Sequence, residues 1–575
     1  MGKVKFIFDN SNLNESYSGV TTPLTFSFAR RVYESVYIGF CKLLGVQDKE
    51  ISKNADIFSN MVNYLGGRMY YDLINWYRMI SLLPGYKFNR KFLEGMMGVE
   101  EEFAYKEDSK TGPVRKIIDL LLMIYRFVKI SAIFLLMDLL IKKFNKNFDK
   151  NFAYLESTNL KNKTDKELIS FYNSFEKKLT KDFSVPIAND FAVMVSVGTL
   201  KLLSKKWLGD NDESKTNYLI TCGQELKSAE PGKAFNLILS SIESSKVLTD
   251  LFQKNSLEKI VEKINFDRSF QDFKNQINFY IKTYGSRVPG ELKLESISFQ
   301  DDPEILIRLL KNSISKKKNI ILGRKVLNDK IERQIINLPF LKRKALAFFL
   351  GWSKKSIARR EETRFKRTLI FGTARKVFLD FGRRLKDQRQ LDNLRDIFYL
   401  EIEEIFENLI NKSPRRLSKL VKTRKELEKY WGKLDLPRRI ATNQSAEKYN
   451  LELFKKISPE KEKIMGDKIV KGQVASMGGS NSVVLGQSLV ISEFDPTKNF
   501  SDKILITRQT DPGWTIVFPS LKGLVVERGG ILSHAAVVAR EFGIPCIINA
   551  KEATKLIPDN RTVKMELESG IVSVK

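Results

Sequence analysis

The chain has 575 residues, of which 42% are hydrophobic and 11% aromatic. It is therefore long enough for about three to five folded domains and too apolar to be a disordered protein. Its formal net charge of +30 suits a polyanionic partner. Because Lys is interleaved with Asp and Glu along the chain, without an arginine-rich tail or an aromatic nucleic-acid module, we expect no nucleic-acid binding.

The cysteines and the N-terminus indicate a cytoplasmic protein. Cys41, Cys222 and Cys546 are scattered thiols without metal-ligand spacing, and their odd number argues against a disulfide framework. The first residues contain no apolar run long enough for a secretory signal, because Asp9 and Asn10 interrupt it. We therefore expect a reducing compartment, the cytoplasm.

A large helical region comes first along the chain. From about residue 23 to residue 457, apolar residues recur at intervals of three and four, the spacing of amphipathic helices. The most apolar stretch, from Ile117 to Ile141, approaches the length of a membrane span but contains charged residues, which predicts a buried bundle helix and no membrane span. We expect residues 1–457 to form one large, mainly α-helical domain.

A small α/β domain follows the helical one. From Asp467 the pattern changes to short β-branched runs separated by Gly, Asn and Pro. The predicted strands are KIVKGQVAS, SVVLGQSLVIS, KILITR, GLVVE, CIINA and TVKMEL, and one helix, HAAVVAREF, lies among them. The charged, proline-containing segment 458–466 is predicted to be a linker, which leaves residues 467–575 as the second domain.

The only histidine of the chain, His534, is expected at the start of that helix. Ser533 is a good N-cap residue whose hydroxyl can accept a hydrogen bond from the first turn, and Gly543 and Pro545 end the helix. The unpaired N–H groups of a helix N-terminus attract anions and disfavour protonation of an imidazole there. His534 is then a neutral nucleophile that can accept a phosphoryl group.

The two glycines before this helix fit the same interpretation. Gly529 and Gly530 let a phosphate approach the backbone closely, so we assign them, with Ser533, to phosphoryl binding and support. The spacing alone is equally compatible with a histidine that only packs against the helix or caps it.

The segment GG-x-x-SHAAVVARE-x-GIP resembles the phosphohistidine signature of the swivelling domain in PEP-utilising enzymes, which include pyruvate phosphate dikinase, PEP synthase and rifampin phosphotransferase. The segment TDPGW is most similar to the rifampin phosphotransferase branch. The resemblance implies that His534 is the residue that accepts the phosphoryl group. Leu532 departs from the Thr common in the dikinases, which puts the dikinase reaction itself in doubt.

The resemblance extends to the helical region, through segments such as NESYSGVTTPLTFSFAR, YGSRVPGEL, FQDDPEIL and REETRFKRTLIFGTARKVFLDFGRRL. These are similar to the central substrate-binding domain of rifampin phosphotransferase-like proteins. The family's ATP-grasp domain, which uses ATP and Mg²⁺, normally precedes this region, and a PEP-binding barrel follows the swivelling domain in the dikinases. The resemblance therefore implies a separately encoded ATP-grasp subunit as phosphoryl donor and a small-molecule hydroxyl or carboxylate as acceptor.

Arginine and glutamate residues of these segments are candidates for the acceptor site. Arg287, Glu291, Arg364 and Arg384 are predicted to bind substrate, since Arg forks suit phosphate. A structural salt bridge is the alternative for Arg287 and Glu291, acidic neighbours are the alternative for Arg364, and a solvated helix end is the alternative for Arg384. Ser286 stands where the family often has His, so an acid–base role there is in doubt.

Five other residues receive structural roles. Asp511 is expected to shape a turn with the following Pro and Gly, Trp514 to pack between domains, and Arg540 to pair with a carboxylate. Asp301 and its acidic neighbour are expected to cap a helix, so we predict no metal bound by the protein.

The sequence therefore predicts a multidomain phosphotransferase component that carries a phosphoryl group on His534, with ATP and Mg²⁺ supplied through a partner. One alternative is a non-catalytic or regulatory relative that lost its donor domain. The other is a basic protein that binds polyanions.

Overall fold

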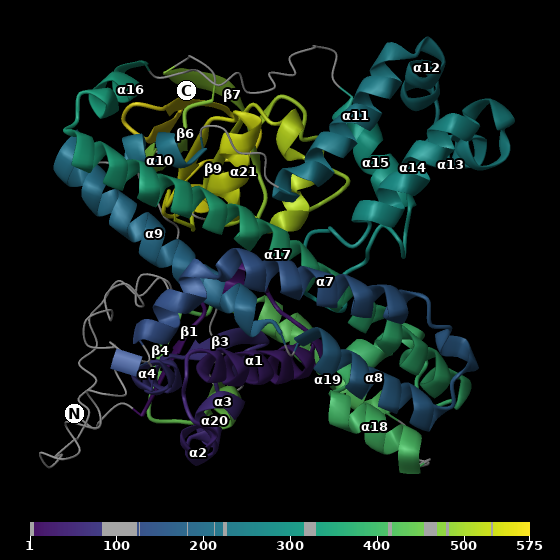
Figure 1. Cartoon of the computed structure of the whole chain (residues 1–575). Helices are drawn as coiled ribbons and strands as arrows, with labels where there is room; N and C mark the ends of the chain where they lie inside the picture. Colours follow the sequence, from purple (N-terminus) through teal and green to yellow (C-terminus); the bar gives the residue numbers. More distant parts are fainter. Residues whose placement is uncertain are drawn as a thin grey trace, which may run out of the picture. The chain divides into compact units, whose positions relative to one another are not determined.

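The computed structural model describes residues 5–82, 124–125, 127–180, 182–211, 213–221, 227–314, 329–411, 417–453, 469–478, 482–530 and 533–575 (Figure 1). Its internal contacts divide the chain into two compact units. Unit 1 comprises Met1–Val195, Leu292–Glu295 and Leu369–Glu460, and unit 2 comprises Ser196–Glu291, Ser296–Thr368 and Lys461–Lys575.

The order of a large helical region followed by a small α/β domain is confirmed. The contacts nevertheless group the C-terminal residues with part of the helical region, because they share a core with it. The predicted linker 458–466 lies outside the described residues, so the boundaries at 457 and 467 stay predictions.

Helices make up most of unit 1. They are α1 (Pro23–Leu43), α2 (Asp48–Lys53), α3 (Ala55–Ser59), α4 (Leu73–Ser81), α7 (Met137–Glu156), α8 (Asp165–Thr180), α18 (Ile402–Asn411), α19 (Ser418–Gly432) and α20 (Ala446–Leu453), with the first part of α9 (Ser184–Leu208) and the last part of α17 (Phe340–Asp387). Short 3₁₀ turns lie at Leu13–Glu15, Leu160–Asn162 and Leu394–Tyr399.

Unit 1 also contains a four-stranded antiparallel sheet that the sequence analysis missed. Its strands are β1 (Phe6–Asp9), β2 (Val62–Leu65), β3 (Arg68–Asp72) and β4 (Arg439–Thr442), in the order β2-β3-β1-β4. Two glycines with positive φ, Gly66 and Gly67, close the β2–β3 hairpin, as a two-residue turn of this hand requires. Each strand has only four or five residues, too few for alternation to be recognised within a helical pattern.

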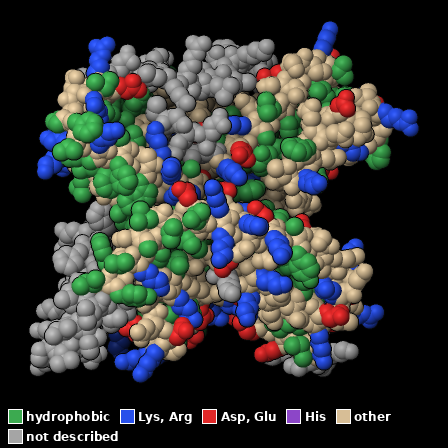
Figure 2. Space-filling view, in the orientation of Figure 1, with side chains coloured by type: hydrophobic (Ala, Val, Ile, Leu, Met, Phe, Trp, Pro, Cys, Tyr) green, Lys and Arg blue, Asp and Glu red, His purple; other side chains and the backbone are tan. Residues whose placement is uncertain are grey.

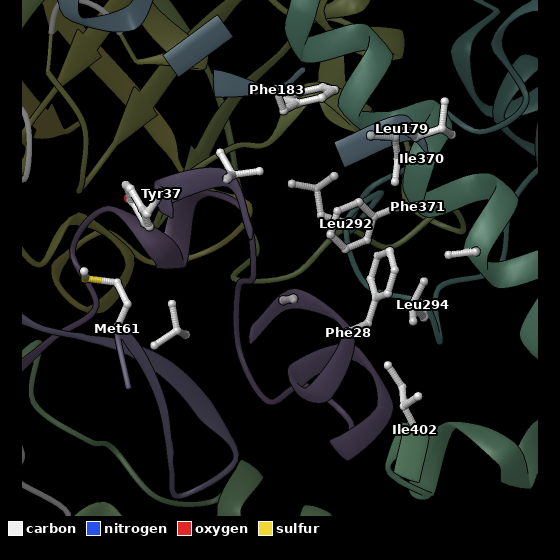
Figure 3. Close-up of a cluster of buried hydrophobic side chains, with 14 of the residues drawn as sticks. Phe28, Tyr37, Met61, Leu179, Phe183, Leu292, Leu294, Ile370, Phe371 and Ile402 are labelled. Carbon is white, nitrogen blue, oxygen red and sulfur yellow. The ribbon is translucent and has the colours of Figure 1, made fainter. Parts of the chain in front are cut away.

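The core of unit 1 is built from apolar side chains of distant segments. Figure 3 shows Phe28 of α1 beside Phe371 of α17, with Leu292 and Leu294 close by. The rings of Phe28 and Phe371 meet edge to face with centroids 5.0 Å apart, a favoured aromatic geometry. Phe28 is fully buried, so this pair anchors α1 to α17 within the unit.

The apolar stretch from Ile117 to Ile141 is described only in part, and one side of it is exposed. Ile133, Met137 and Ile141 are buried, whereas Leu135 is 84% exposed. The expectation of a fully buried bundle helix is therefore wrong for one face of the described part. By length and composition alone, one described stretch, Asp165–Leu208, is long and apolar enough to cross a membrane, and 56% of its most apolar window is buried inside the protein.

Unit 2 contains a second set of helices. They are α10 (Ser214–Thr221), α11 (Glu230–Ser244), α12 (Lys246–Lys254), α13 (Leu257–Phe266), α14 (Gln271–Tyr284), α15 (Glu304–Ser313), α16 (Asp329–Ile336), α21 (His534–Phe542) and α22 (Ala553–Leu556), with the remaining parts of α9 and α17. Short 3₁₀ turns lie at Lys227–Ala229, Arg268–Phe270, Pro512–Ile516 and Phe518–Ser520.

An eight-stranded mixed sheet forms the C-terminal part of unit 2. Its strands are β5 (Ile469–Lys471), β6 (Gln473–Ser476), β7 (Val483–Val490), β8 (Lys503–Thr507), β9 (Gly523–Val526), β10 (Cys546–Ile548), β11 (Thr562–Glu566) and β12 (Ile571–Val574), in the order β5-β12-β11-β7-β8-β9-β10-β6. Strands β7, β8, β9 and β10 are parallel. All six predicted strand segments are confirmed, with KIVKGQVAS divided into β5 and β6, and β12 was missed.

Three of the parallel strands, β8, β9 and β10, are buried on both faces, as expected for strands with nearly continuous apolar runs, whereas the first half of β7 is partly exposed. On one face Leu524 and Val526 of β9 pack with α21 and with helices α11, α14 and α15, in a single hydrophobic core. On the other face Val525 packs with Ile504 and Ile547. Helix α21 connects β9 to its parallel neighbour β10, so the loop after β9 places His534 at the edge of the core shared with the helices.

Truncation of Phe28 tests the core of unit 1. We expect Phe28→Ala to lower the free energy of unfolding by about 3–5 kcal/mol, because it leaves a cavity where the ring packs on Phe371. The urea midpoint measures this, with Leu135→Ala at an 84% exposed site as the control expected to change it little. Equal midpoints for the two variants would contradict this account of the core.

Candidate functional site

His534 is the first residue of α21, as predicted, and Gly543 ends this helix in the left-handed conformation with φ of 64°. Ser533 occupies the N-cap position, but its hydroxyl makes no capping hydrogen bond, so that part of the prediction is wrong. The hydroxyl instead lies against Gly529, where an added Cβ would be 2.8 Å from Ser533 Oγ. Gly529 has φ of 124°, and Gly530 has open space around it, as close approach to a ligand requires.

Two threonine hydroxyls hold the imidazole ring. Thr510 Oγ1 lies 3.2 Å from Nδ1 of His534, and Thr515 Oγ1 lies 3.0 Å from Nε2. Thr515 donates its only hydroxyl proton to the carbonyl oxygen of Pro512, at 2.8 Å, and must therefore accept from Nε2–H. The hydrogen-bond pattern thus assigns the proton to Nε2 and the lone pair to Nδ1, which accepts from Thr510.

Burial keeps this ring neutral. His534 is only 4% exposed and packs against Phe518, with ring centroids 5.7 Å apart. Burial, followed by the positive charges of Arg287 and Arg364, lowers the pKa of His534 well below its ordinary value of 6.5. At neutral pH the imidazole therefore keeps one unprotonated nitrogen, and the main cause is desolvation and not the predicted effect of the helix terminus.

The turn that carries Thr515 is fastened to the loop after α14. Asp511 Oδ1 accepts from the N–H of Gly513 at 2.9 Å, which confirms its predicted turn-shaping role. Its other oxygen, Oδ2, accepts from the N–H of Gly290 at 2.8 Å. A Cβ at Gly513 would lie 2.0 Å from the carbonyl carbon of Val288, so the two backbones touch at this point.

That loop contributes a buried ion pair. Arg287 Nη1 donates to both carboxylate oxygens of Glu291, at 2.8 and 3.1 Å, and both side chains are buried. The guanidinium also lies over the ring of Phe365, 5.1 Å from its centroid. The structural salt bridge considered from the sequence is therefore present, and the same structure places Arg287 close enough to His534 for its charge to lower the pKa of the imidazole.

The other two predicted substrate-binding arginines lie in different units. Arg364 belongs to unit 2 and contributes to the low pKa of His534, while its own acidic neighbour is Glu361, at 3.4 Å. Arg384 belongs to unit 1, where it bonds to Asp165 and Asp380 at 2.8 and 2.9 Å. Within unit 2, Arg287 and Arg364 thus act on the charge of His534, Glu291 belongs to the site only through its ion pair with Arg287, and Arg384 is not part of this group.

The remaining predictions in unit 2 have mixed outcomes. Trp514 packs edge to face on Phe494 in the core shared with the helices, which confirms a packing role. Arg540 donates to the carbonyl oxygen of Ala475 and not to a carboxylate, so that prediction is wrong. Burial lowers the pKa of Arg540 to about 10.

The pair Asp301 and Asp302 bonds locally, to Ser298 and to the N–H of Glu304, as expected for residues at a helix start. Among the described residues, no group of three or more His, Cys, Asp or Glu side chains is placed to hold a metal ion.

Sequence analysis missed Thr510 and Thr515 as members of the site. They flank the Asp-Pro-Gly turn in the order Thr-Asp-Pro-Gly-Trp-Thr, and that turn predicts that the chain reverses here. A chain reversal between two threonines was a signal that both hydroxyls could face one ligand or side chain. What sequence could not indicate is that the side chain would be His534.

Two regions of the chain match known families. Residues 500–570 match the model of the PEP-utilising enzyme mobile domain. Residues 187–361 match the Rifampicin phosphotransferase fourth domain. The first region contributes Thr510, Thr515 and His534 to the site, and the second contributes Arg287 and Glu291.

Several relatives share these regions with the chain. Rifampicin phosphotransferase of Bacillus cereus is 27% identical over 357 residues, which cover 58% of this chain and 37% of that protein. The protein of the same name from Bacillus subtilis is 25% identical, with 64% of this chain and 42% of that protein covered. The one from Streptomyces sviceus is 22% identical, with 72% and 47% covered. The chain thus spans less than half the length of these relatives, and the predicted resemblance is confirmed.

The depressed pKa of His534 makes stability depend on pH. The unfolded imidazole binds a proton below about pH 6.5, whereas the buried one does not, so the unfolded state holds more protons and gains stability as the pH falls. Between pH 6.5 and 5.5 we expect unit 2 to lose up to about 1.4 kcal/mol per pH unit. Calorimetry of the wild type and of His534→Asn should show this extra slope only in the wild type. Parallel pH profiles would show that the folded ring titrates normally.

Replacement of Gly513 tests the contact between the turn and the loop. An added methyl group would lie 2.0 Å from Val288 C and 2.1 Å from Pro289 N, backbone atoms that cannot rotate away. We expect Gly513→Ala to destabilise unit 2 by at least about 1–3 kcal/mol in urea denaturation. Gly530→Ala is the matched control, because a Cβ there meets nothing within 4 Å. If both variants melt alike, the turn and the loop are not in contact.

Proposed function

We propose that His534 is a phosphoryl carrier, which takes the group from a donor and passes it to a small-molecule acceptor. The observation that carries this proposal is a buried imidazole that the hydrogen bonds of Thr510 and Thr515 hold in its neutral form, with the positive charges of Arg287 and Arg364 acting on it. A neutral ring nitrogen has the lone pair that attack on phosphorus needs, and the cations of Arg287 and Arg364 offset the negative charge that arrives with the group. The mobile-domain match supports the same role.

The transfer has two balanced steps. In the first, the ring nitrogen forms a bond to phosphorus, the bond between phosphorus and the donor oxygen breaks, and its electron pair stays with that oxygen. In the second, the acceptor oxygen attacks phosphorus, the P–N bond breaks, and the ring recovers its lone pair while the acceptor hydroxyl loses its proton to a base. Both ring nitrogens are bonded to threonine hydroxyls, so one of these contacts has to break before the first step.

Burial of the ring requires movement. At 4% exposure, His534 is out of reach of a donor held by another protein, so the ring has to leave this position to be charged. Rigid-body movement of a small domain between a donor site and an acceptor site meets that requirement. We propose that residues 467–575 move in this way.

The donor and the acceptor are proposed from the resemblance. A separately encoded ATP-grasp subunit would cleave ATP with Mg²⁺ and charge His534. No metal-ligating group of three or more side chains converges among the described residues, so we place no step on an ion held by this chain. The acceptor would be a hydroxyl or carboxylate of a small molecule, in the reducing environment of the cytoplasm.

Polyanion binding is the less favoured alternative. On the face that Figure 2 shows, Lys and Arg side chains are scattered among acidic and apolar ones and do not form one continuous basic surface. A polyanion needs several phosphate contacts along its backbone. A scattered positive charge fits solvated helix faces better.

Because the chain has one histidine, phosphorylation is simple to assign. We expect the full chain, incubated with phosphoramidate as a small donor, to gain one phosphate that acid removes and alkali does not, measured by intact-protein mass spectrometry. His534→Asn should gain none, and ATP should label the wild type only when the donor subunit is added. Absence of acid-labile phosphate in the wild type would favour the non-catalytic alternative.

A further inference from the structure

Arg287 presents one edge of its guanidinium group to no partner. Glu291 accepts only from Nη1, and the buried Nε and Nη2 have no hydrogen-bond acceptor among the described residues. Phe365 covers one flat face of the guanidinium group. The edge that carries Nε and Nη2 is then the part of the group left to bind a ligand in its plane. This edge has the two parallel N–H donors that bind two oxygens of one phosphate group.

The vacant edge is not needed for the ion pair. Glu291 already neutralises the charge of Arg287 through Nη1. A buried donor without an acceptor is unfavourable, so the protein is less stable with these two nitrogens unsatisfied than with both of them bonded to an anion. An anion with two oxygens at this edge would remove that cost and bring the negative charge that a second nearby cation, Arg364, also favours.

A second unsatisfied group lies beside the histidine. Ser533 is 8% exposed, and its buried hydroxyl has no hydrogen-bond partner among the described residues. Ser533 directly precedes His534 in the chain, and its hydroxyl lies against Gly529. Because Gly529 has no side chain, it offers the hydroxyl no side-chain partner. Each of the two sequence regions that build the site therefore has hydrogen-bond donors without an acceptor. Ser533 contributes one from the C-terminal region, and Arg287 contributes two from the helical region.

The backbone fixes these groups in one place. The loop that carries Arg287 is hydrogen-bonded through Gly290 to Asp511, and the turn that Asp511 shapes carries Thr515, which bonds to His534. Three hydrogen bonds, of 2.8, 2.9 and 3.0 Å, thus connect the loop that carries Arg287 to the turn that holds the ring. It also lies near enough for its charge to act on the ring.

We propose that the Nε–Nη2 edge of Arg287, together with the hydroxyl of Ser533, is the binding site for the phosphoryl group when it is on or next to His534. This inference rests on the proposed function and deepens it. Arg287 binds the transferred group, and Glu291 is a positioning residue that holds Nη1 and leaves the Nε–Nη2 edge for the ligand. The ligand chemistry is a phosphate dianion, either joined to the ring or free.

The experiment uses the full chain, inorganic phosphate as the probe and the NMR signals of the single imidazole. We expect phosphate to shift the His534 signals in a saturable way in the wild type. Arg287→Met/Glu291→Leu removes both charges together, so no lone buried ion remains to unfold the protein. In that variant we expect phosphate to bind about 10- to 100-fold more weakly, because two charge-assisted hydrogen bonds are lost, and phosphoramidate to charge His534 more slowly.

Two further variants separate the site from general effects on folding. Glu291→Gln keeps the vacant edge of Arg287 and should retain phosphate binding better than the double variant. Asp9→Leu/Arg439→Met removes a comparable ion pair of unit 1, with its 2.9 Å contact, and should leave the phosphate response of His534 unchanged.

The outcomes also separate this inference from the proposed function. If the double variant binds phosphate and is phosphorylated as well as the wild type, Arg287 is not the receptor, although His534 remains the carrier. If the wild type binds phosphate through Arg287 but His534 never becomes phosphorylated, the anion site stands and the carrier function fails. A wild type whose His534 signals do not respond to phosphate would overturn the site.

Discussion

The candidate site depends on the side chain of Asp511. One of its oxygens closes the turn at Gly513 and the other holds Gly290, so a single carboxylate joins the turn before α21 to the loop after α14. Close contact between Gly513 and Val288 leaves no space for sliding between the two backbones. Thr515 is thereby fixed on one side and Arg287 on the other, and the ring of His534 lies where both can act on it.

Much of the C-terminal fold was predictable because its central strands β8, β9 and β10 are buried on both faces. Apolar runs such as KILIT and GLVV need no alternation to be recognised, and turn residues mark their ends. The four-stranded sheet of unit 1 could not be predicted in this way. Strands β1 and β4 pair across more than four hundred residues of sequence, and Asp9 meets Arg439 only in the fold. No local pattern contains that information.

The same distinction applies to the site. The position of His534 at the start of its helix could be predicted because Gly529, Gly530 and Gly543 mark both ends of that helix, whereas its role as a carrier came from the resemblance. The predicted cap at Ser533 failed because the hydroxyl lies against Gly529 and not over the first turn of the helix. The spacing of Arg287 and Glu291 indicated a pair, but only the structure shows that the pair leaves one guanidinium edge vacant.

Burial and reactivity make opposite demands on this histidine. Desolvation keeps the ring neutral, and Thr510 and Thr515 satisfy both nitrogens, so the unphosphorylated ring is stable where it lies. A phosphoryl group on either nitrogen would remove one threonine contact and bring negative charge into a buried position. The two states of the ring then differ in how much they gain from this location, and the cations of Arg287 and Arg364, with the proposed contact to Ser533, favour the charged one here. Under the proposed function, the position described here becomes favourable again once the phosphoryl group has left the ring. Transfer of the group would therefore favour return of the domain to this position.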